Sequence, residues 1–112
     1  MFIPYNSIHE IEVQNLIEII NENNIIFPYQ CPNCKEIDTH IYFHKNNNSE
    51  IGGIWIWCGS CKHYLHGSII PPTWWKNYSL ITTEDLYAEP YKLDSVKNEL
   101  DKHFNELYKM NF

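Results

Sequence analysis

Cys31-Pro32-Asn33-Cys34 and Cys58-Gly59-Ser60-Cys61 contain all four cysteines of this 112-residue chain, as two Cys-x-x-Cys pairs. Each pair fits a tight turn that directs two sulfurs toward one point, and two such turns complete the tetrahedral four-sulfur shell that Zn²⁺ prefers. The interval between the pairs exceeds the ~15–20 residues of the commonest signature, and the polar run of residues 46–50 accounts for the excess as a longer hairpin loop. The pattern predicts one structural zinc ion per chain, bound by Cys31, Cys34, Cys58 and Cys61.

Two other uses of the cysteines remain as alternatives to zinc. Trp57-Cys58-Gly59-Ser60-Cys61 resembles the redox motif of thioredoxins, but that motif begins a helix, whereas residues 62–71 predict a strand and then a loop. Structural disulfides require an oxidising compartment, and no stretch of the signal-peptide type follows Met1. Four histidines near the turns are reserve ligand candidates, although surface or hydrogen-bonding roles are favoured for them: His40, His44, His63 and His66.

Residues 25–71 resemble a zinc ribbon, the family of small β-sheets built on two Cys-x-x-Cys turns. Pro32 and Gly59 fit the tight turns of that family. The resemblance implies a small antiparallel sheet around a structural zinc ion. Because zinc ribbons serve many functions, it does not imply an activity.

Two helices are predicted, one on each side of this segment. Ser7-Ile8-His9-Glu10 is a capping box, which predicts a helix over residues 8–23. Asp94 or Ser95 is a candidate N-cap for a C-terminal helix over residues 94–109. Each helix has an apolar stripe that predicts one buried face. The stripe of the first helix consists of Val13, Leu16, Ile17 and Ile20, and that of the second of Val96, Leu100, Phe104 and Leu107.

Four strands are predicted between the helices, over residues 25–29, 39–44, 51–57 and 64–70. Alternation along Ile54-Trp55-Ile56-Trp57 places two isoleucines on one face and two tryptophans on the other, so both faces of this strand require cover. Thr82 or Thr83 can begin a short helical turn before Pro90. The expected fold is α+β, a single domain over residues 1–112 in which a small antiparallel zinc-ribbon-like sheet is flanked by N-terminal and C-terminal helices.

Residues 71–78 form the most unusual predicted loop, because two prolines precede three large aromatic side chains, Trp74, Trp75 and Tyr78. Aromatic side chains are enriched in the buried centres of protein interfaces. A small domain can also fold such a loop over its own core. Both interpretations, interface and core, are open from the sequence alone.

Charge favours a protein partner over nucleic acid. The formal net charge is −6, and the eight basic residues are all lysines. Attraction to phosphates requires a basic face, and a bidentate arginine is a common specific contact to guanine, but this chain contains no arginine. An acidic chain repels nucleic acid and attracts basic proteins. No apolar run approaches the ~20 residues of a membrane span, and reduced cysteines are typical of the cytoplasm, so we expect a cytoplasmic protein without a membrane anchor.

The sequence contains no nucleophile–base motif and no glycine-rich phosphate loop, so we expect a binding module rather than an enzyme. In size, acidity and aromatic content it resembles the immunity proteins of bacterial polymorphic toxin systems. That resemblance implies inhibition of a basic toxin domain, with the aromatics as anchors and carboxylates in place of phosphates. The alternative is a zinc-ribbon regulator that binds nucleic acid or the transcription machinery. The candidate contact residues are Trp74, Trp75 and Tyr78 together with Glu84, Asp85 and Glu89, or with Glu10, Glu12, Glu18 and Glu22.

Overall fold

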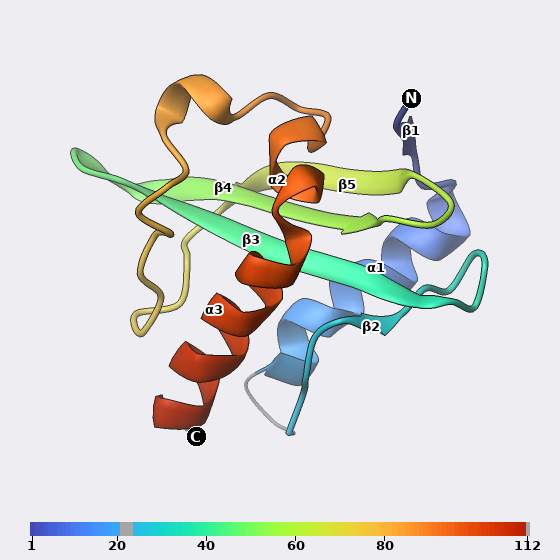
Figure 1. Cartoon of the computed structure of the whole chain (residues 1–112), viewed down its shortest axis with the longest axis horizontal. Coiled ribbons are helices and arrows are strands. Elements are labelled where there is room, and N and C mark those ends of the chain that lie inside the picture. Colours follow the sequence, from blue (N-terminus) through green and yellow to red (C-terminus); the bar gives the residue numbers. More distant parts are fainter. Residues whose placement is uncertain (21–23, 112) are drawn as a thin grey trace.

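The computed structural model describes residues 1–20 and 24–111 and has an α+β architecture. Its five-stranded sheet has the order β1-β5-β4-β3-β2, with α1 and α3 on opposite faces (Figure 1). The strands are β1 (Ile3–Pro4), β2 (Tyr29–Gln30), β3 (Ile37–Asn46), β4 (Ser49–Cys58) and β5 (His63–Ile69). The helices are α1 (Ser7–Ile20), the short 3₁₀ helix η1 (Thr83–Asp85), α2 (Tyr91–Ser95) and α3 (Lys97–Asn111). None of the described helices combines the length and the apolar character needed to cross a membrane.

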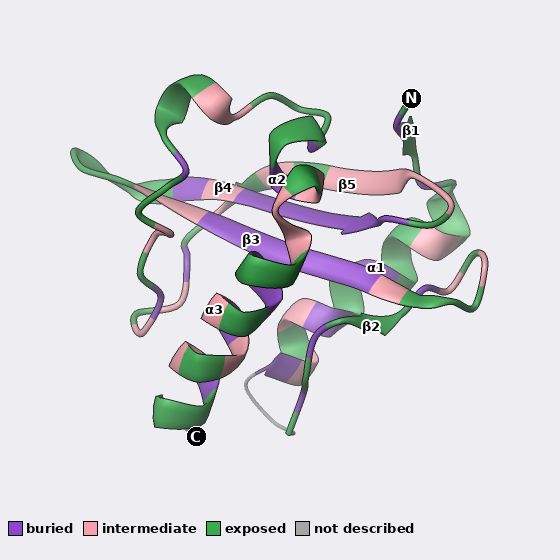
Figure 2. Cartoon of the chain, in the orientation of Figure 1, coloured by how far each residue is buried: buried purple, intermediate pink, exposed green. Residues whose placement is uncertain are grey.

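The hairpin of β3 and β4 forms the centre of the sheet. Trp57 pairs with His40, and Ile56 pairs with Ile41. Trp57 and His40 therefore share one face of the sheet, and Ile56 and Ile41 share the other. Both faces are buried along the central part of the hairpin, residues 39–43 and 54–58, as the purple segments of β3 and β4 in Figure 2 show. The prediction that Ile54-Trp55-Ile56-Trp57 needs cover on both sides is confirmed, because all four side chains are at most 5% exposed.

Helix α1 packs on the sheet through its predicted stripe. Val13, Leu16 and Ile20 are buried, whereas Ile8 and Ile11 remain 69% and 60% exposed. The predicted capping box is wrong by one residue: the side chain of Asn6 accepts the N–H of His9 at 3.0 Å, so the helix begins at Ser7. The last part of the predicted helix, residues 21–23, lies outside the described residues.

The sheet is mixed rather than purely antiparallel, because β1 pairs with β5 in the parallel sense. A two-residue strand has no alternation to detect, so the sequence did not reveal β1. The strand expected over residues 25–29 is reduced to β2. Before β2, the backbone N–H and C=O of Phe27 bond to the side-chain amide of Asn105 on α3, at 3.0 and 2.8 Å. That amide takes the place of a strand partner.

The predicted C-terminal helix is divided in two. Helix α2 begins after Pro90, and Val96 has φ −123° and ψ 28°, which interrupts the helix before α3. Asp94 and Ser95 therefore lie inside α2 rather than capping α3. The apolar stripe nevertheless packs as expected, because Leu100 and Phe104 are both 0% exposed. The short turn predicted near Thr82 corresponds to η1, where the N–H of Thr82 donates to the carboxylate of Asp85.

Candidate metal centre

The two Cys-x-x-Cys turns meet at one end of the sheet and bring all four sulfurs together. One turn joins β2 to β3 and the other joins β4 to β5. The four Sγ atoms lie within 4.8 Å of one another, with Cys31 and Cys61 3.7 Å apart and Cys34 and Cys58 3.6 Å apart. A tetrahedron with metal–sulfur distances of about 2.3 Å places its sulfurs about 3.8 Å apart. The cluster therefore has the size of a four-thiolate metal site.

The two turns share one backbone conformation. In each, the carbonyl of the first cysteine accepts the N–H of the lysine after the second, from Lys35 at 2.9 Å and from Lys62 at 3.0 Å. Both lysines adopt left-handed backbone angles, with φ of 68° and 63°. The pattern is thus Cys-x-x-Cys-Lys in both turns, a repetition that is visible in the sequence. A lysine in the left-handed conformation costs about 1–2 kcal/mol relative to the right-handed one. Other interactions of each turn must therefore compensate for this cost.

Hydrogen bonds around Cys31 favour its thiolate. The hydroxyl of Tyr5, at the end of β1, lies 3.2 Å from the Cys31 sulfur. Burial raises the pKa of Cys31, but the bonds from Tyr5 and from the backbone of Cys34 and Asn33 outweigh it and lower that pKa to about 7. Burial raises the pKa of Cys34 and of Cys58 above the ordinary value. A bound dication would instead lower the pKa values of Cys34 and Cys58, because it stabilises thiolates strongly.

A second group of polar side chains connects the turn of Cys58 to α3. The backbone carbonyl of Asp38 accepts the N–H of Gly59 at 2.9 Å, and its carboxylate accepts the hydroxyl of Ser60 at 2.9 Å. Lys97 of α3 lies 3.2 Å from both oxygens of the same carboxylate. Burial opposes ionisation of Asp38, but the bonds from His40, Ser60 and Lys97 bring its pKa below the usual range. The turn of Cys58 is therefore connected to α3 through Asp38.

His40 completes this network between two carboxylates. One ring nitrogen bonds to Asp38, and the other lies 2.7 Å from Asp101 of α3. The hydrogen-bonding role favoured for His40 in the sequence is confirmed. The sequence did not reveal four residues around the cysteines, because no local pattern connects residues so distant in the chain. These residues are Tyr5, Asp38, Lys97 and Asp101. His63, a reserve ligand candidate in the sequence, lies outside the four-sulfur cluster. Its Nδ1 is 3.2 Å from the carbonyl of Cys61.

No family model, curated protein or solved structure matches this chain. These comparisons therefore do not confirm the zinc-ribbon resemblance of residues 25–71. The geometry itself supports an α+β fold with a four-cysteine cluster that could hold a metal ion.

The aromatic loop of residues 71–78 covers the free edge of β3. Trp75 is 1% exposed and its ring centroid lies 5.4 Å from those of Tyr42 and Phe43. The side chain of Asn77 bonds to both the N–H and the C=O of Lys45, at 2.8 and 2.9 Å, as a neighbouring strand would. The core interpretation of this loop thus applies to Trp75. Trp74 and Tyr78 are half-buried.

The candidate acidic contacts differ in exposure. Glu84 and Glu89 are exposed, and Asp85 is half-buried in its bond to Thr82. Of the acids on the first helix, Glu10, Glu12 and Glu18 are exposed on α1, and Glu22 lies outside the described residues.

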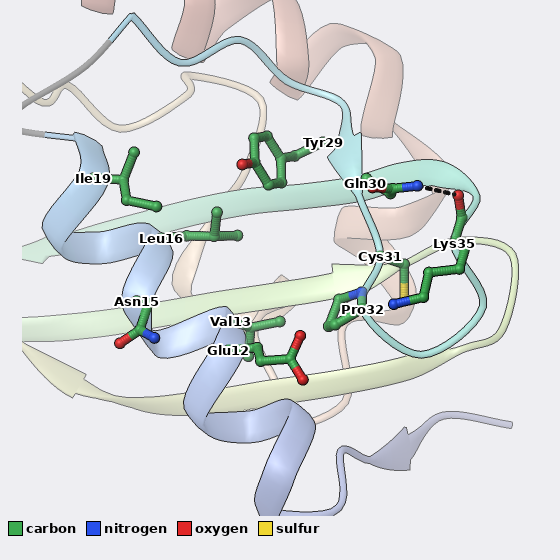
Figure 3. A pocket seen from close by; sticks show the side chains of 10 residues that line it. All are labelled: Glu12, Val13, Asn15, Leu16, Ile19, Tyr29, Gln30, Cys31, Pro32 and Lys35. Carbon is green, nitrogen blue, oxygen red and sulfur yellow. Dashed lines mark hydrogen bonds between the residues drawn. The ribbon is translucent and has the colours of Figure 1, made fainter.

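A hollow of 340 Å³ separates α1 from the first cysteine turn (Figure 3). Its described polar lining includes Glu12 on the helix and Gln30 and Lys35 on the opposite side, where the Gln30 amide donates to the Lys35 carbonyl at 3.1 Å. Cys31 is the one described cysteine in this lining, and it belongs to the sulfur cluster. The described lining therefore contains no nucleophile with an adjacent base of the kind that covalent catalysis requires.

Proposed function

We propose that this chain is a zinc-stabilised protein-binding module, without catalytic activity of its own, that inhibits a basic toxin domain in the bacterial cytoplasm as an immunity protein. The first support is the donor set. Four thiolates complete the tetrahedral shell of Zn²⁺, which is typical of structural rather than catalytic sites. The ion would join the β2–β3 turn to the β4–β5 turn. Structural zinc contributes about 10–16 kcal/mol in small peptides, an amount comparable to the stability of a whole domain.

The observation that carries the partner assignment is the exposed face of α1. The helix uses Val13, Leu16 and Ile20 against the sheet and leaves Ile8 and Ile11 largely exposed. Glu10 and Glu12 are exposed on the two flanks of the helix, where Glu10 lines the hollow beside β5 and Glu12 lines the hollow beside the first cysteine turn. Apolar anchors flanked by carboxylates are suited to a partner that offers both apolar and basic groups.

Overall charge favours the same kind of partner. The net charge is −6 before any metal is considered, and four thiolates around one dication add a further −2. Such a field accelerates association with a basic protein and disfavours phosphate backbones. Nuclease toxins have basic substrate grooves, and a carboxylate-bearing helix could occupy such a groove in place of phosphates.

The test is purification of the tagged chain with its partners from cells that express it, with elemental analysis of the same sample. We expect a toxin domain in equal amount and one zinc ion per chain. A double charge reversal, Glu10→Lys with Glu12→Lys, should abolish recovery of the toxin domain. Glu99→Lys on the exposed side of α3 is the matched control and should leave recovery unchanged. Recovery of polymerase subunits or nucleic acid would contradict the immunity function and favour the regulator.

A further inference from the structure

The outer edge of β5 is only partly covered by β1. Strand β1 pairs with His63 and Tyr64 alone, and after Tyr5 the chain turns into α1. The N–H of Tyr5 donates to the carbonyl of Tyr64 at 3.0 Å, which shows that the even-numbered residues of β5 direct their backbone groups toward the β1 side. The backbone N–H and C=O groups of His66 and Ser68 therefore also point toward the β1 side of the strand. Within residues 1–20 and 24–111, no strand pairs with β5 beyond Tyr64 on that side.

Nothing in β5 itself blocks this edge. Natural edge strands are protected by lysines, prolines or bulges. The strand His63–Ile69 contains no lysine and no proline, and its pairing with β4 runs from Tyr64 to Ile69 without a register shift. His66 and Ser68 are exposed. The edge therefore presents two residues with outward N–H and C=O groups that a further strand could bond.

A continuous groove follows the same edge. One hollow of 240 Å³ lies at the β1 end, between Tyr5 and Ala88, and a second of 310 Å³ lies along the far half of β5 beside α1. The two hollows share Glu10, Leu65 and His66 in their linings, so they run into each other. The two hollows leave space beside the β5 edge for side chains of an incoming strand.

The charge of the groove selects its occupant. Glu10 and Glu18 line it from α1, and no lysine is among its described lining residues. Ile17 and Leu65 supply an apolar base between the carboxylates. A second copy of this chain would bring the same carboxylates and another net charge of −6 to the contact. An extended segment with lysine or arginine at alternate positions matches both the backbone groups and the carboxylates.

We propose that the β5 edge, from His66 to Ile69, binds an extended basic segment of a protein partner as a sixth strand of the sheet. This inference rests on the proposed function, because it assigns to the same basic partner a further contact surface beside the exposed face of α1. The N–H and C=O groups of His66 and Ser68 bond the incoming backbone. Alternate side chains of the segment enter the groove, where Glu10 and Glu18 bind their cationic ends.

The probe is a ten-residue peptide of alternating lysine and valine, compared with one of alternating glutamate and valine. Binding is measured by titration, and amide hydrogen exchange of the full-length zinc-loaded protein is followed residue by residue. We expect the lysine peptide to bind, the glutamate peptide not to bind, and the His66 and Ser68 amides to exchange at least about tenfold more slowly in the complex. Binding without protection of these two amides, or no binding, would overturn the proposal. Protection that instead grows with protein concentration alone would identify a second copy as the occupant and overturn it equally.

Ser68→Pro removes one outward N–H without removing a bond to β4, a position at which an edge strand tolerates proline. We expect it to weaken peptide binding at least about tenfold, whereas Ser68→Ala keeps the N–H and should bind within about twofold of the unaltered protein. If Ser68→Pro fails to fold, the double variant Glu10→Gln with Glu18→Gln tests the same groove through its charge. It should weaken lysine-peptide binding and flatten its salt dependence. Unchanged affinity in the double variant contradicts the proposal.

The two proposals can fail separately. A toxin domain that binds Ser68→Pro as well as the unaltered protein would preserve the immunity function and overturn the β5 edge as its site. A lysine peptide that protects His66 and Ser68, in cells where no toxin is recovered, would preserve the site and overturn the immunity function.

Discussion

Nδ1 of His40, on β3, lies 2.7 and 2.9 Å from the two carboxylate oxygens of Asp101, on α3. His40 is 1% exposed and Asp101 is 6% exposed, so this bond crosses the interior between sheet and helix. Burial raises the pKa of Asp101, and the bond from His40 opposes that shift. Because Asp38 occupies the other nitrogen of the ring, the pair also connects α3 with the turn of Cys58.

Replacing Asp101 with asparagine should therefore lower the free energy of unfolding by about 1–3 kcal/mol, the usual cost of losing a buried hydrogen bond to a charged group. The measurement is chemical denaturation of the zinc-loaded protein. Glu99→Gln, on the exposed side of the same helix, is the control and should change stability by less than about 0.5 kcal/mol. Equal stability of the two variants would show that the His40–Asp101 bond contributes nothing net.

Replacement of a cluster cysteine should remove both metal and stability. We expect Cys34→Ser, or treatment with a strong chelator, to release one zinc ion and to unfold at least the two turns, because metal binding and folding are coupled. Elemental analysis and circular dichroism measure the two effects. Ser49→Ala, at the start of β4, is the control. Retention of a full equivalent of zinc by Cys34→Ser would exclude a four-cysteine site.

The hydroxyl of Tyr5 should tune the metal affinity. Tyr5→Phe removes the bond to the Cys31 sulfur while keeping the buried ring, and groups that orient metal ligands typically change affinity by about 10–100-fold. Competition with a chromogenic chelator gives the zinc affinity directly. Tyr87→Phe, at an exposed tyrosine, should leave it unchanged. An unchanged affinity in Tyr5→Phe would mean that the hydroxyl only fills space.

Replacing each of the two left-handed lysines with glycine should change the stability of the protein differently. Lys35→Gly relieves a strained backbone and should raise the free energy of unfolding by up to about 1 kcal/mol. Lys62 also bonds to Asp94 at 2.9 Å and lies 5.3 Å from the ring centroid of Phe2. Lys62→Gly should therefore stabilise less, or destabilise. Thermal unfolding of both variants tests this, and destabilisation by Lys35→Gly would contradict the expected relief of strain.

The aromatic loop should behave as part of the core at one position. Trp75→Ala should cost about 3–5 kcal/mol in unfolding free energy, as truncation of a buried tryptophan does. Trp74→Ala, at a half-buried neighbour, should cost less. Denaturation curves of the two variants give the comparison. A Trp75→Ala protein as stable as the unaltered one would restore Trp75 as a candidate partner contact.

Several of these features were predictable because they depend on local patterns. The spacing of Cys31, Cys34, Cys58 and Cys61 predicted the sulfur cluster, since two turns of this type can converge on one point. Alternation in Ile54-Trp55-Ile56-Trp57 predicted cover on both faces of the sheet. The apolar stripes of residues 8–23 and 94–109 predicted which helix faces are buried.

Other features required the tertiary structure because they depend on residues far apart in the chain. The network of Asp38, His40 and Asp101 forms only when α3 crosses β3. Asn105 replaces a strand partner for Phe27 across 78 positions of sequence. Whether Trp75 is core or surface was decided by the path of the loop over the edge of β3. The sequence alone determined the donor set and the buried faces, through spacing and periodicity. Packing decided the helix boundaries, the mixed sheet and the open edge of β5, because non-local contacts outweigh local propensity there.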